Sequence, residues 1–354
     1  MVMSRKSIIT PFVDAFCIGG FSIVVLTPFI IYGGSLLDIQ DTTDFQNKFI
    51  WGTILLNMPH FLASYWLVYR SKEMVLRHKW ASIYVPLLMG GYCLFALAKY
   101  EETVAYVTVL NIVNGVYLSR HYTGQTWGMM ATFSYLGGVP FSRSERTLIR
   151  SSLNIMLLWH VAWYFFLIKD IRPGLVYPME MFYKGMTWLT LLSLALSTTG
   201  FLMVKRRTGR FPPVRVWIAM VSIYVWYAAM WRWPPAIFIV QLLGHSLQYL
   251  IFPARMKAND LTSRDIDDSP RFELRLLLFG ILLVLVSFYL YDQLPAHLAG
   301  VVGALFGGPS ELVLGIVVFA FISIHHYFTD GCIWKISNRD VRKELFAHVA
   351  REAA

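Results

Sequence analysis

The chain has 354 residues, of which 56% are hydrophobic and 15% are charged, whereas an ordinary soluble domain carries about 25% charged residues. Apolar runs long enough to cross a hydrocarbon core of about 30 Å as helices recur along the sequence. The composition therefore predicts an all-α, polytopic transmembrane helix bundle and argues against a soluble enzyme. The net charge of +10 comes from basic residues in short segments between these runs, which argues against nucleic-acid binding.

Ten membrane-spanning helices are predicted, with both termini in the cytoplasm. The segments after the even-numbered helices are basic, as in KRRTGR and PARMK, and those after the odd-numbered helices are acidic or mixed, as in KYEE and YDQLPAH. Because Lys and Arg are retained on the cytoplasmic side, this alternation predicts the orientation and favours a bacterial inner membrane. The predicted helices cover residues 11–33, 48–69, 81–99, 104–138, 149–169, 183–204, 214–232, 235–253, 273–291 and 311–334.

The whole chain, residues 1–354, is predicted to form a single integral membrane domain. Its longest polar connection, residues 254–272, is predicted to be a cytoplasmic loop that either carries a short surface helix or is mobile, and residues 335–354 are predicted to be a cytoplasmic tail. The segment 104–138 is too long for one straight helix perpendicular to the membrane, and its glycines predict a bend or break. Broken backbone at membrane depth is tolerated where it lines a buried cavity.

Several histidines are predicted to share one depth in the membrane. His60, His245 and His325 each stand ten residues before the basic residue that follows their helix, which places each about 15 Å from the cytoplasmic boundary. A bend would bring His121 to the same layer. An ionisable side chain at this depth is costly unless it is paired or coordinated, and imidazole is a common ligand of iron, copper, zinc and nickel. The four histidines therefore predict a buried metal site, against the alternative of hydrogen bonds to neighbouring helices.

The segment FISIHHYFTDGCIWK adds a second histidine and a carboxylate. His326 and Asp330 share one face of their predicted helix, whereas His325 is rotated from His326 by about 100°. A regular helix cannot easily direct both histidines at one ion, so one is predicted to support the ligands, or the site holds two ions. Asp330 is a candidate ligand, a candidate base, or the partner that fixes an imidazole tautomer, and an ordinary interfacial role stays open.

Polar side chains accompany two of the histidines at helical spacing. Gln125 follows His121 by four residues, and Gln248 and Tyr249 follow His245 by three and four. Such neighbours orient ligating histidines, and Tyr249 is in addition a candidate for catalysis. The alternative is that these side chains only link helices by hydrogen bonds.

The remaining histidines are predicted to contribute less. His160 lies in the middle of a helix of the opposite direction and is a second-tier candidate for cofactor binding. His78, in a basic loop, His297, on the outer side, and His348, in the tail, are predicted to be solvated.

Four short motifs resemble, in the same order, the histidine motifs of the bacterial and archaeal membrane β-carotene dioxygenase family (the Brp/Blh-like proteins). They are NMPHFLASY at His60, LSRHYTGQ at His121, LLGHSLQYL at His245, and IHHYFTD at His325, which Asp330 follows five residues later. The chain departs from the family pattern at Ser64, where the first motif has an acid, and at Tyr249, where the third has a second histidine.

The resemblance implies a non-haem iron oxygenase that uses O₂ on a lipophilic substrate from the bilayer. It implies His60, His121, His245 and His325 as ligands, with His326 and Asp330 supporting them or binding a second iron ion. An electron donor is a further expected partner. The chemistry expected of such a centre is activation of O₂ in a dry pocket.

Two other classes of protein stay open. A bis-His haem protein that transfers electrons needs only two facing histidines, and a transporter needs polar residues across the full membrane depth or inverted repeats with interrupted helices. The concentration of polarity in one predicted layer favours a metal-dependent oxidoreductase over both.

Overall fold

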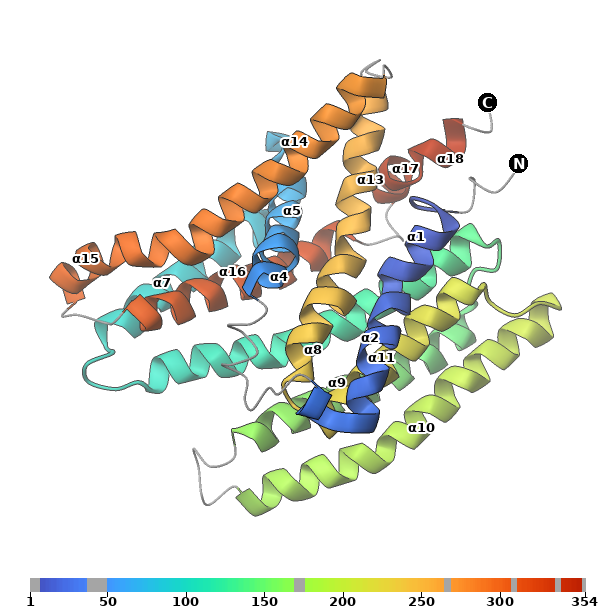
Figure 1. The fold of residues 1–354 in the computed structure, drawn as a ribbon, viewed down its shortest axis with the longest axis horizontal. Coiled ribbons are helices and arrows are strands. Elements are labelled where there is room, and N and C mark those ends of the chain that lie inside the picture. The colour runs from blue at the N-terminus through green and yellow to red at the C-terminus, as the bar shows by residue number, and fades with distance from the viewer. Residues whose placement is uncertain are drawn as a thin grey trace. The chain divides into compact units, whose positions relative to one another are not determined.

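The computed structural model describes residues 7–36, 50–168, 176–263, 269–306, 311–334 and 339–351, and its regular elements there are all helices (Figure 1). The prediction of an all-α protein is confirmed for this part of the chain. Every bound given below refers to these described residues.

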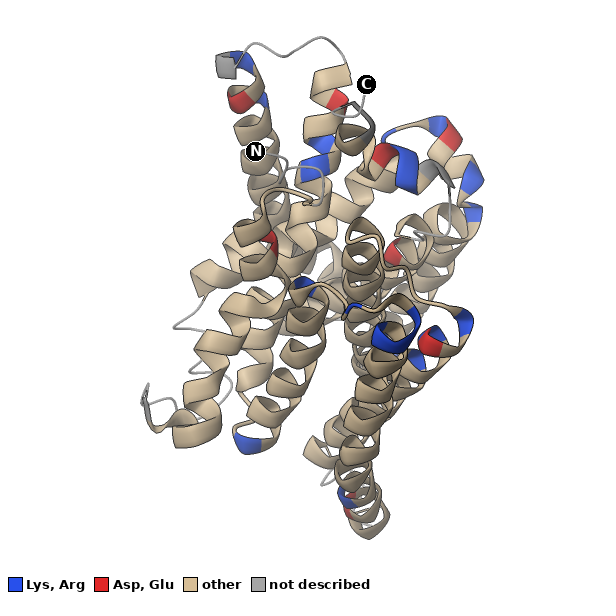
Figure 2. Cartoon of the chain, turned by 90° about the vertical axis from the view of Figure 1, so that its right-hand side faces the viewer, with Lys and Arg blue, Asp and Glu red and all other residues tan. Residues whose placement is uncertain are grey.

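Seven helical stretches in the described ranges are long and apolar enough to cross a membrane. Figure 2 shows how few Lys, Arg, Asp and Glu residues lie along the long helices. The chain is an integral membrane protein on this evidence, while ten spans and the orientation of the termini stay predictions. The seven stretches are Pro11–Ser35, Trp80–Ala98, Val176–Thr208, Val214–Arg232, Ala236–Ser263, Arg271–Leu305 and Glu311–Ile333.

The chain divides into two compact units. Unit 1 consists of residues 1–48, 119–251 and 348–354, and unit 2 of residues 49–118 and 252–347. Both units contain helices that could cross a membrane, so this division leaves the predicted single membrane domain as a prediction. Three of the described helices contribute residues to both units: α8 (Ala105–Leu136), α13 (Leu247–Ser263) and the short α18 (Ala347–Arg351).

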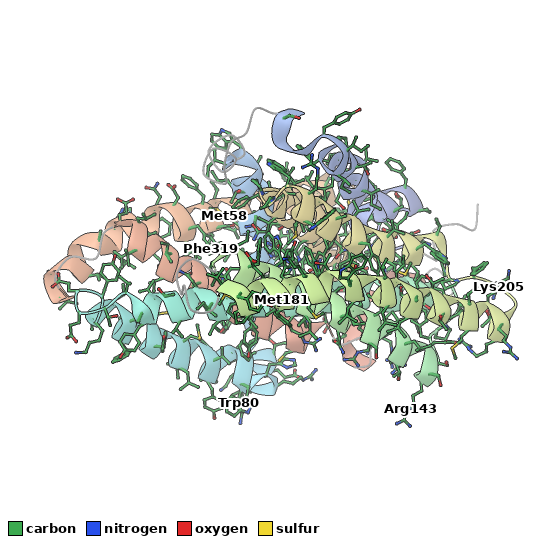
Figure 3. All side chains as sticks on the ribbon, turned by 90° about the horizontal axis from the view of Figure 1, so that it is seen from below. Met58, Trp80, Arg143, Met181, Lys205 and Phe319 are labelled. Carbon is green, nitrogen blue, oxygen red and sulfur yellow. The ribbon has the colours of Figure 1, made fainter. Side chains whose placement is uncertain are left out.

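Unit 1 is built on two helix pairs. Helix α9 packs along α10, and α11 packs along α2. Figure 3 shows Arg143, at the start of α9, and Lys205, near the end of α10, at the same end of their antiparallel pair. The elements are α1 (Pro11–Ala15), the π-helix η2 (Phe16–Gly20), α2 (Phe21–Tyr32), the 3₁₀ turn η3 (Gly33–Leu36), α9 (Arg143–Leu167), α10 (Val176–Thr208), α11 (Val214–Arg232), α12 (Ala236–Ile239), the π-helix η8 (Val240–Ser246) and the short α18 (Ala347–Arg351).

Unit 2 is centred on α16, which packs against α5, α7 and α15, while α5 also packs against α14. An apolar cluster that includes Leu97, Leu110, Leu314 and Val317 joins α7, α15 and α16 with the first part of α8. The elements are α4 (Ile50–Gly52), the π-helix η4 (Thr53–Asn57), α5 (Met58–Tyr69), α6 (Lys72–Arg77), the π-helix η5 (Trp80–Tyr84), α7 (Val85–Ala98), α14 (Ser269–Phe288), the π-helix η9 (Tyr289–Gln293), α15 (Leu294–Phe306), α16 (Glu311–Ile333) and α17 (Arg339–Leu345).

The break predicted within residues 104–138 is wrong, because α8 is one uninterrupted helix of 32 residues. Gly124 and Gly128 lie inside it, and each costs helix stability relative to Ala without requiring a bend. The helix ends at a glycine instead: Gly138 adopts a φ of 71°, and the amide of Val139 donates to the carbonyl of Ser134. This left-handed residue is the usual helix terminator.

Two predicted connections are also more helical than expected. Helix α13 continues to Ser263 and α14 begins at Ser269, so most of the predicted loop 254–272 is helix. The predicted helix 273–291 is too short, because η9 and α15 continue the helical path to Phe306. The cytoplasmic position of the first connection stays a prediction.

Candidate metal centre

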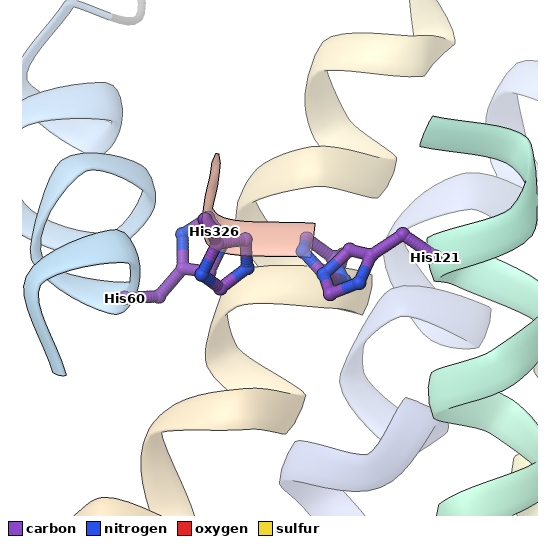
Figure 4. Close-up of side chains that lie close together, drawn as sticks. His60, His121 and His326 are labelled. Carbon is purple, nitrogen blue, oxygen red and sulfur yellow. The ribbon is translucent and has the colours of Figure 1, made fainter. Parts of the chain in front are cut away.

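Unit 2 contains two buried histidines in direct contact. His60 lies in α5 and His326 in α16, and neither side chain is exposed to solvent. Their ring centroids are 4.8 Å apart and the rings are nearly perpendicular, at 88°. Figure 4 shows the two rings side by side. A ring nitrogen of each lies within 4.8 Å of the other, close to the spacing of about 4 Å or less expected for two ligands of one ion.

Hydrogen bonds fix the tautomers of this pair. Nδ1 of His60 donates to the backbone carbonyl of Asn57, which leaves the lone pair of Nε2 available. Nδ1 of His326 lies 2.8 Å from Oγ of Ser64, and that hydroxyl donates its own proton to the carbonyl of Phe61 at 2.7 Å. His326 must therefore donate through Nδ1, and its Nε2 is likewise an available ligand atom. Metal-binding histidines are held in this way.

Asp330 lies one helical turn after His326, on the same face of α16. Its Oδ2 is 3.4 Å from Nε2 of His326, which is long for a hydrogen bond. Neighbouring ligands at about 2.1 Å from one ion are about 3.0–3.4 Å apart. The spacing therefore suits two ligands of one ion, and the carboxylate would offset the charge of a cation that imidazoles leave uncompensated.

The structure directs His325 away from His60. Its Nε2 lies 2.8 Å from the carbonyl of Ala81 in η5, and its ring contacts Tyr65 at 4.8 Å between centroids. The implied ligand set therefore needs a correction in unit 2, because His326 stands beside His60 where His325 was expected. The rotation of about 100° between successive residues of a helix is the physical reason.

Unit 1 contains a second buried pair. His121, in α8, and His245, in η8, have ring centroids 4.7 Å apart at 76°, and both side chains are buried. Gln125 donates to the backbone carbonyl of His245 at 3.0 Å and to Oε1 of Gln248 at 2.6 Å. Gln248 in turn donates to the carbonyl of Ile18 at 2.6 Å. The two predicted glutamines thus fasten the backbone that carries His245.

An aromatic layer separates His160 from this pair. The ring of Tyr122 is 4.9 Å from that of His245 and 5.6 Å from that of His160. His160 also contacts Trp163 and Tyr227, each at 5.5 Å between ring centroids. Sequence reasoning did not single out Tyr122, although its position directly after His121 is a signal.

The predicted catalytic Tyr249 is buried one turn after His245, in α13. Of the three histidines predicted to be solvated, His297 is exposed and His78 caps α6. The prediction is wrong for His348, which is buried and whose Nε2 lies 2.9 Å from the carbonyl of Ser7.

π-Helical turns adjoin a histidine in each pair. The π-helix η4 ends at Asn57, two residues before Pro59, and Pro59 has no amide to continue the α-helical bonding. The π-helix η8 contains His245 itself. Gly244 in η8 is pressed against the indole of Trp226, since a Cβ at this glycine would lie 2.6 Å from that ring. Wide turns of this kind are common at functional sites.

The described residues thus include four buried histidines that could hold a metal ion, His60 and His326 in unit 2 and His121 and His245 in unit 1. Hydrogen bonds orient the rings of His60 and His326, all four histidines are buried, and imidazole suits iron, copper or zinc. Comparison of the chain with protein-family models, with curated proteins and with solved structures finds no match.

Proposed function

We propose that the chain is a membrane-embedded oxidoreductase, a non-haem iron oxygenase that acts with O₂ on a lipophilic substrate. His60 and His326 would bind an iron ion in unit 2, and His121 and His245 form a second candidate ligand pair in unit 1. The geometry of the His60–His326 pair supports this proposal most directly, because both rings are buried and present Nε2 as a ligand. Two imidazoles alone make an incomplete coordination sphere, and the carboxylate of Asp330, whose Oδ2 lies 3.4 Å from Nε2 of His326, would supply a third ligand.

The side chains around the ligands have distinct tasks in this proposal. Asn57 and Ser64 hold the rings of His60 and His326 so that Nε2 is the ligand atom. Gln125 holds the backbone of His245. Asp330 is placed to bind the ion through Oδ2 or to accept a proton from a reacting group. When bound, iron supplies the activation of O₂.

The apolar surroundings support a lipophilic substrate. Aromatic side chains flank both pairs, for example Phe61 beside His326 at 4.8 Å and Tyr122 beside His245. A site enclosed in this way excludes bulk water and protects reactive species. The proposed oxygenase would take a lipophilic small molecule from the bilayer as its substrate. Some oxygenases also use an electron donor.

Direct contact between the rings argues against a haem held within either pair. The centroid separations of 4.8 and 4.7 Å place the two imidazoles of each pair edge to face, and a porphyrin plane cannot lie between rings that touch. A Soret absorption band in the purified protein would favour the haem alternative over the proposal.

Metal analysis of detergent-purified variants tests the ligand set. We expect iron in the wild type, and we expect His60→Ala and His326→Ala to lose the ion of unit 2. His325→Ala is the matched control, because it removes the adjacent imidazole, and it should retain iron. His121→Ala and His245→Ala test the second pair: if this pair binds an ion of its own, the wild type holds two ions per chain and each of these two variants keeps the ion of unit 2.

Oxygen consumption tests the reaction class. Iron-loaded protein in lipid nanodiscs should consume O₂ when apolar polyenes are added, and His60→Ala should not. A wild-type protein without stoichiometric transition metal would rule out the proposal. Iron without substrate-dependent uptake of O₂ from any lipophilic compound class would retain the metal site and exclude the oxygenase.

A further inference from the structure

A groove in unit 2 lies on the side of α5 away from His60. It has a volume of about 680 Å³ and is lined by residues of α5, α13 and α14. Leu62 lines it, while His60 stands two residues earlier, which is about 200° around the helix. The groove is therefore separate from the candidate metal centre.

The lining of the groove changes from charged to apolar along its length. Arg70 is the C-cap of α5, and Arg275 lies in the first turns of α14. Trp66 lies one turn before Arg70 and Phe279 one turn after Arg275, and their ring centroids are 4.8 Å apart. Beyond this contact Tyr65 and aliphatic side chains line the groove, which ends at Leu62 and Val286. Eleven residues from Arg275 to Val286 span about 16 Å, so the groove fits a molecule with one polar end and a long apolar body.

The polar end carries an excess of positive charge. Arg70 forms an ion pair with Glu344, and Lys257 has a loose contact of 3.7 Å with Asp260. Arg275 has no ion pair among the described residues, and its side chain is exposed. Among the residues that the structure describes, three cations therefore stand against two carboxylates at this end of the groove.

Aromatic rings hold one of these cations in place. Nζ of Lys257 lies 5.6 Å from the ring of Trp66 and 5.5 Å from that of Phe279. Such contacts position an ammonium group while leaving its donors available. Basic pockets between helices at a membrane surface are typical binding sites of lipid phosphates.

We propose that this groove binds a phospholipid with an anionic headgroup. Its phosphate lies against Lys257 and Arg275, and one acyl chain follows the aliphatic wall formed by Leu62, Leu282 and Val286. The site is independent of the metal and of the proposed oxygenase activity.

Thermal unfolding in detergent, with added lipid, tests the proposal. Phosphatidylglycerol should raise the unfolding midpoint in a saturable manner, whereas phosphatidylcholine and inorganic phosphate should not. The double variant K257Q/R275Q should bind phosphatidylglycerol about 30-fold more weakly, since each basic residue contributes roughly fivefold. Arg206→Gln is the matched control, because it removes an exposed arginine of α10 in unit 1.

A second variant addresses the apolar end. Leu282 is 58% exposed, so Leu282→Trp should fold while it obstructs the acyl chain, and it should also weaken the lipid effect. Metal content should be unchanged in all of these variants. An equal shift with phosphatidylcholine, an equal shift with inorganic phosphate, or undiminished binding by K257Q/R275Q would overturn the proposal.

Discussion

Ser64 illustrates how a small side chain can orient a histidine. Its hydroxyl accepts from Nδ1 of His326, donates to Phe61 and is also approached by Oγ1 of Thr329 at 3.3 Å. A hydroxyl at this position orients the imidazole and adds no charge to the site. Partners of this kind tune metal affinity without touching the metal.

Ser64→Ala should lower metal affinity by about 10–100-fold, because His326 loses the group that fixes its tautomer. Competition with a chelator of known affinity measures this loss. Ser287→Ala is the control, since it removes another fully buried serine of unit 2 whose hydroxyl bonds only within its own helix in the contacts described. Equal affinity in wild type and Ser64→Ala would contradict the assigned orientation of His326.

At the scale of single elements, η8 depends on close packing at Gly244. The indole of Trp226 occupies the space of the missing side chain, and its Nε1 donates to Ser22 at 2.8 Å. The absence of a Cβ thus lets three segments of unit 1 meet beside His245.

Gly244→Ala should destabilise the protein by about 1–3 kcal/mol, because the methyl group must displace a large ring in a packed interior. Thermal unfolding in detergent measures the change. Gly280→Ala in α14 provides the comparison, since nothing lies within 4 Å of a Cβ there, and helix propensity alone predicts a slight stabilisation. Equal midpoints for both variants would show that η8 is not packed as described.

An ion pair links α9 to α10 at residues that lie outside the predicted span 149–169. Nε of Arg207 lies 2.8 Å from Oε1 of Glu145, which also completes a capping box with Ser142. Burial alone would raise the pKa of Glu145, but hydrogen bonds from Arg207 and Ser142 outweigh it and hold the pKa below its ordinary value of 4.5.

Glu145→Gln should lower stability at neutral pH by about 1–2 kcal/mol. Because the folded-state pKa is depressed, the contribution of Glu145 is complete above pH 4.5 and is lost as the pH falls through the folded value. The difference between wild type and variant should therefore shrink in acid, as measured by unfolding midpoints across pH. Glu102→Gln, which breaks an exposed pair with Lys99, should have little effect at any pH.

For the whole molecule, the predicted crossing and direction of α8 can be tested independently of the total number of membrane-spanning helices. Helix α8 is not among the seven stretches apolar enough to span a membrane by composition, yet the alternation of charges requires it to cross. Phosphatase fusions placed after Glu102 should be active outside, and those placed after Arg143 should be inactive in the cytoplasm. The same activity at both positions would remove α8 from the set of spans.

The sequence predicted helix ends correctly where prolines mark them. Residues 214–232 were predicted as a helix and form α11 with those bounds, because Pro213 and Pro234 delimit it. It was a poor guide to α8, since glycine weakens a helix without ending it. Depth alone also could not choose between His325 and His326, because adjacent residues differ by 1.5 Å in height but by 100° in direction.

That adjacency gives α16 an asymmetric tolerance to changes in length. One residue inserted before His325 in α16, with the start of the helix held in place, would move every later residue forward by one helix position. The imidazole of His325 would then lie where that of His326 lies now. One residue deleted there would put Tyr327 in that place instead. The insertion should therefore keep a metal ligand beside His60, and the deletion should lose it. The second histidine of the pair thus protects the site against a one-residue insertion but not against a one-residue deletion.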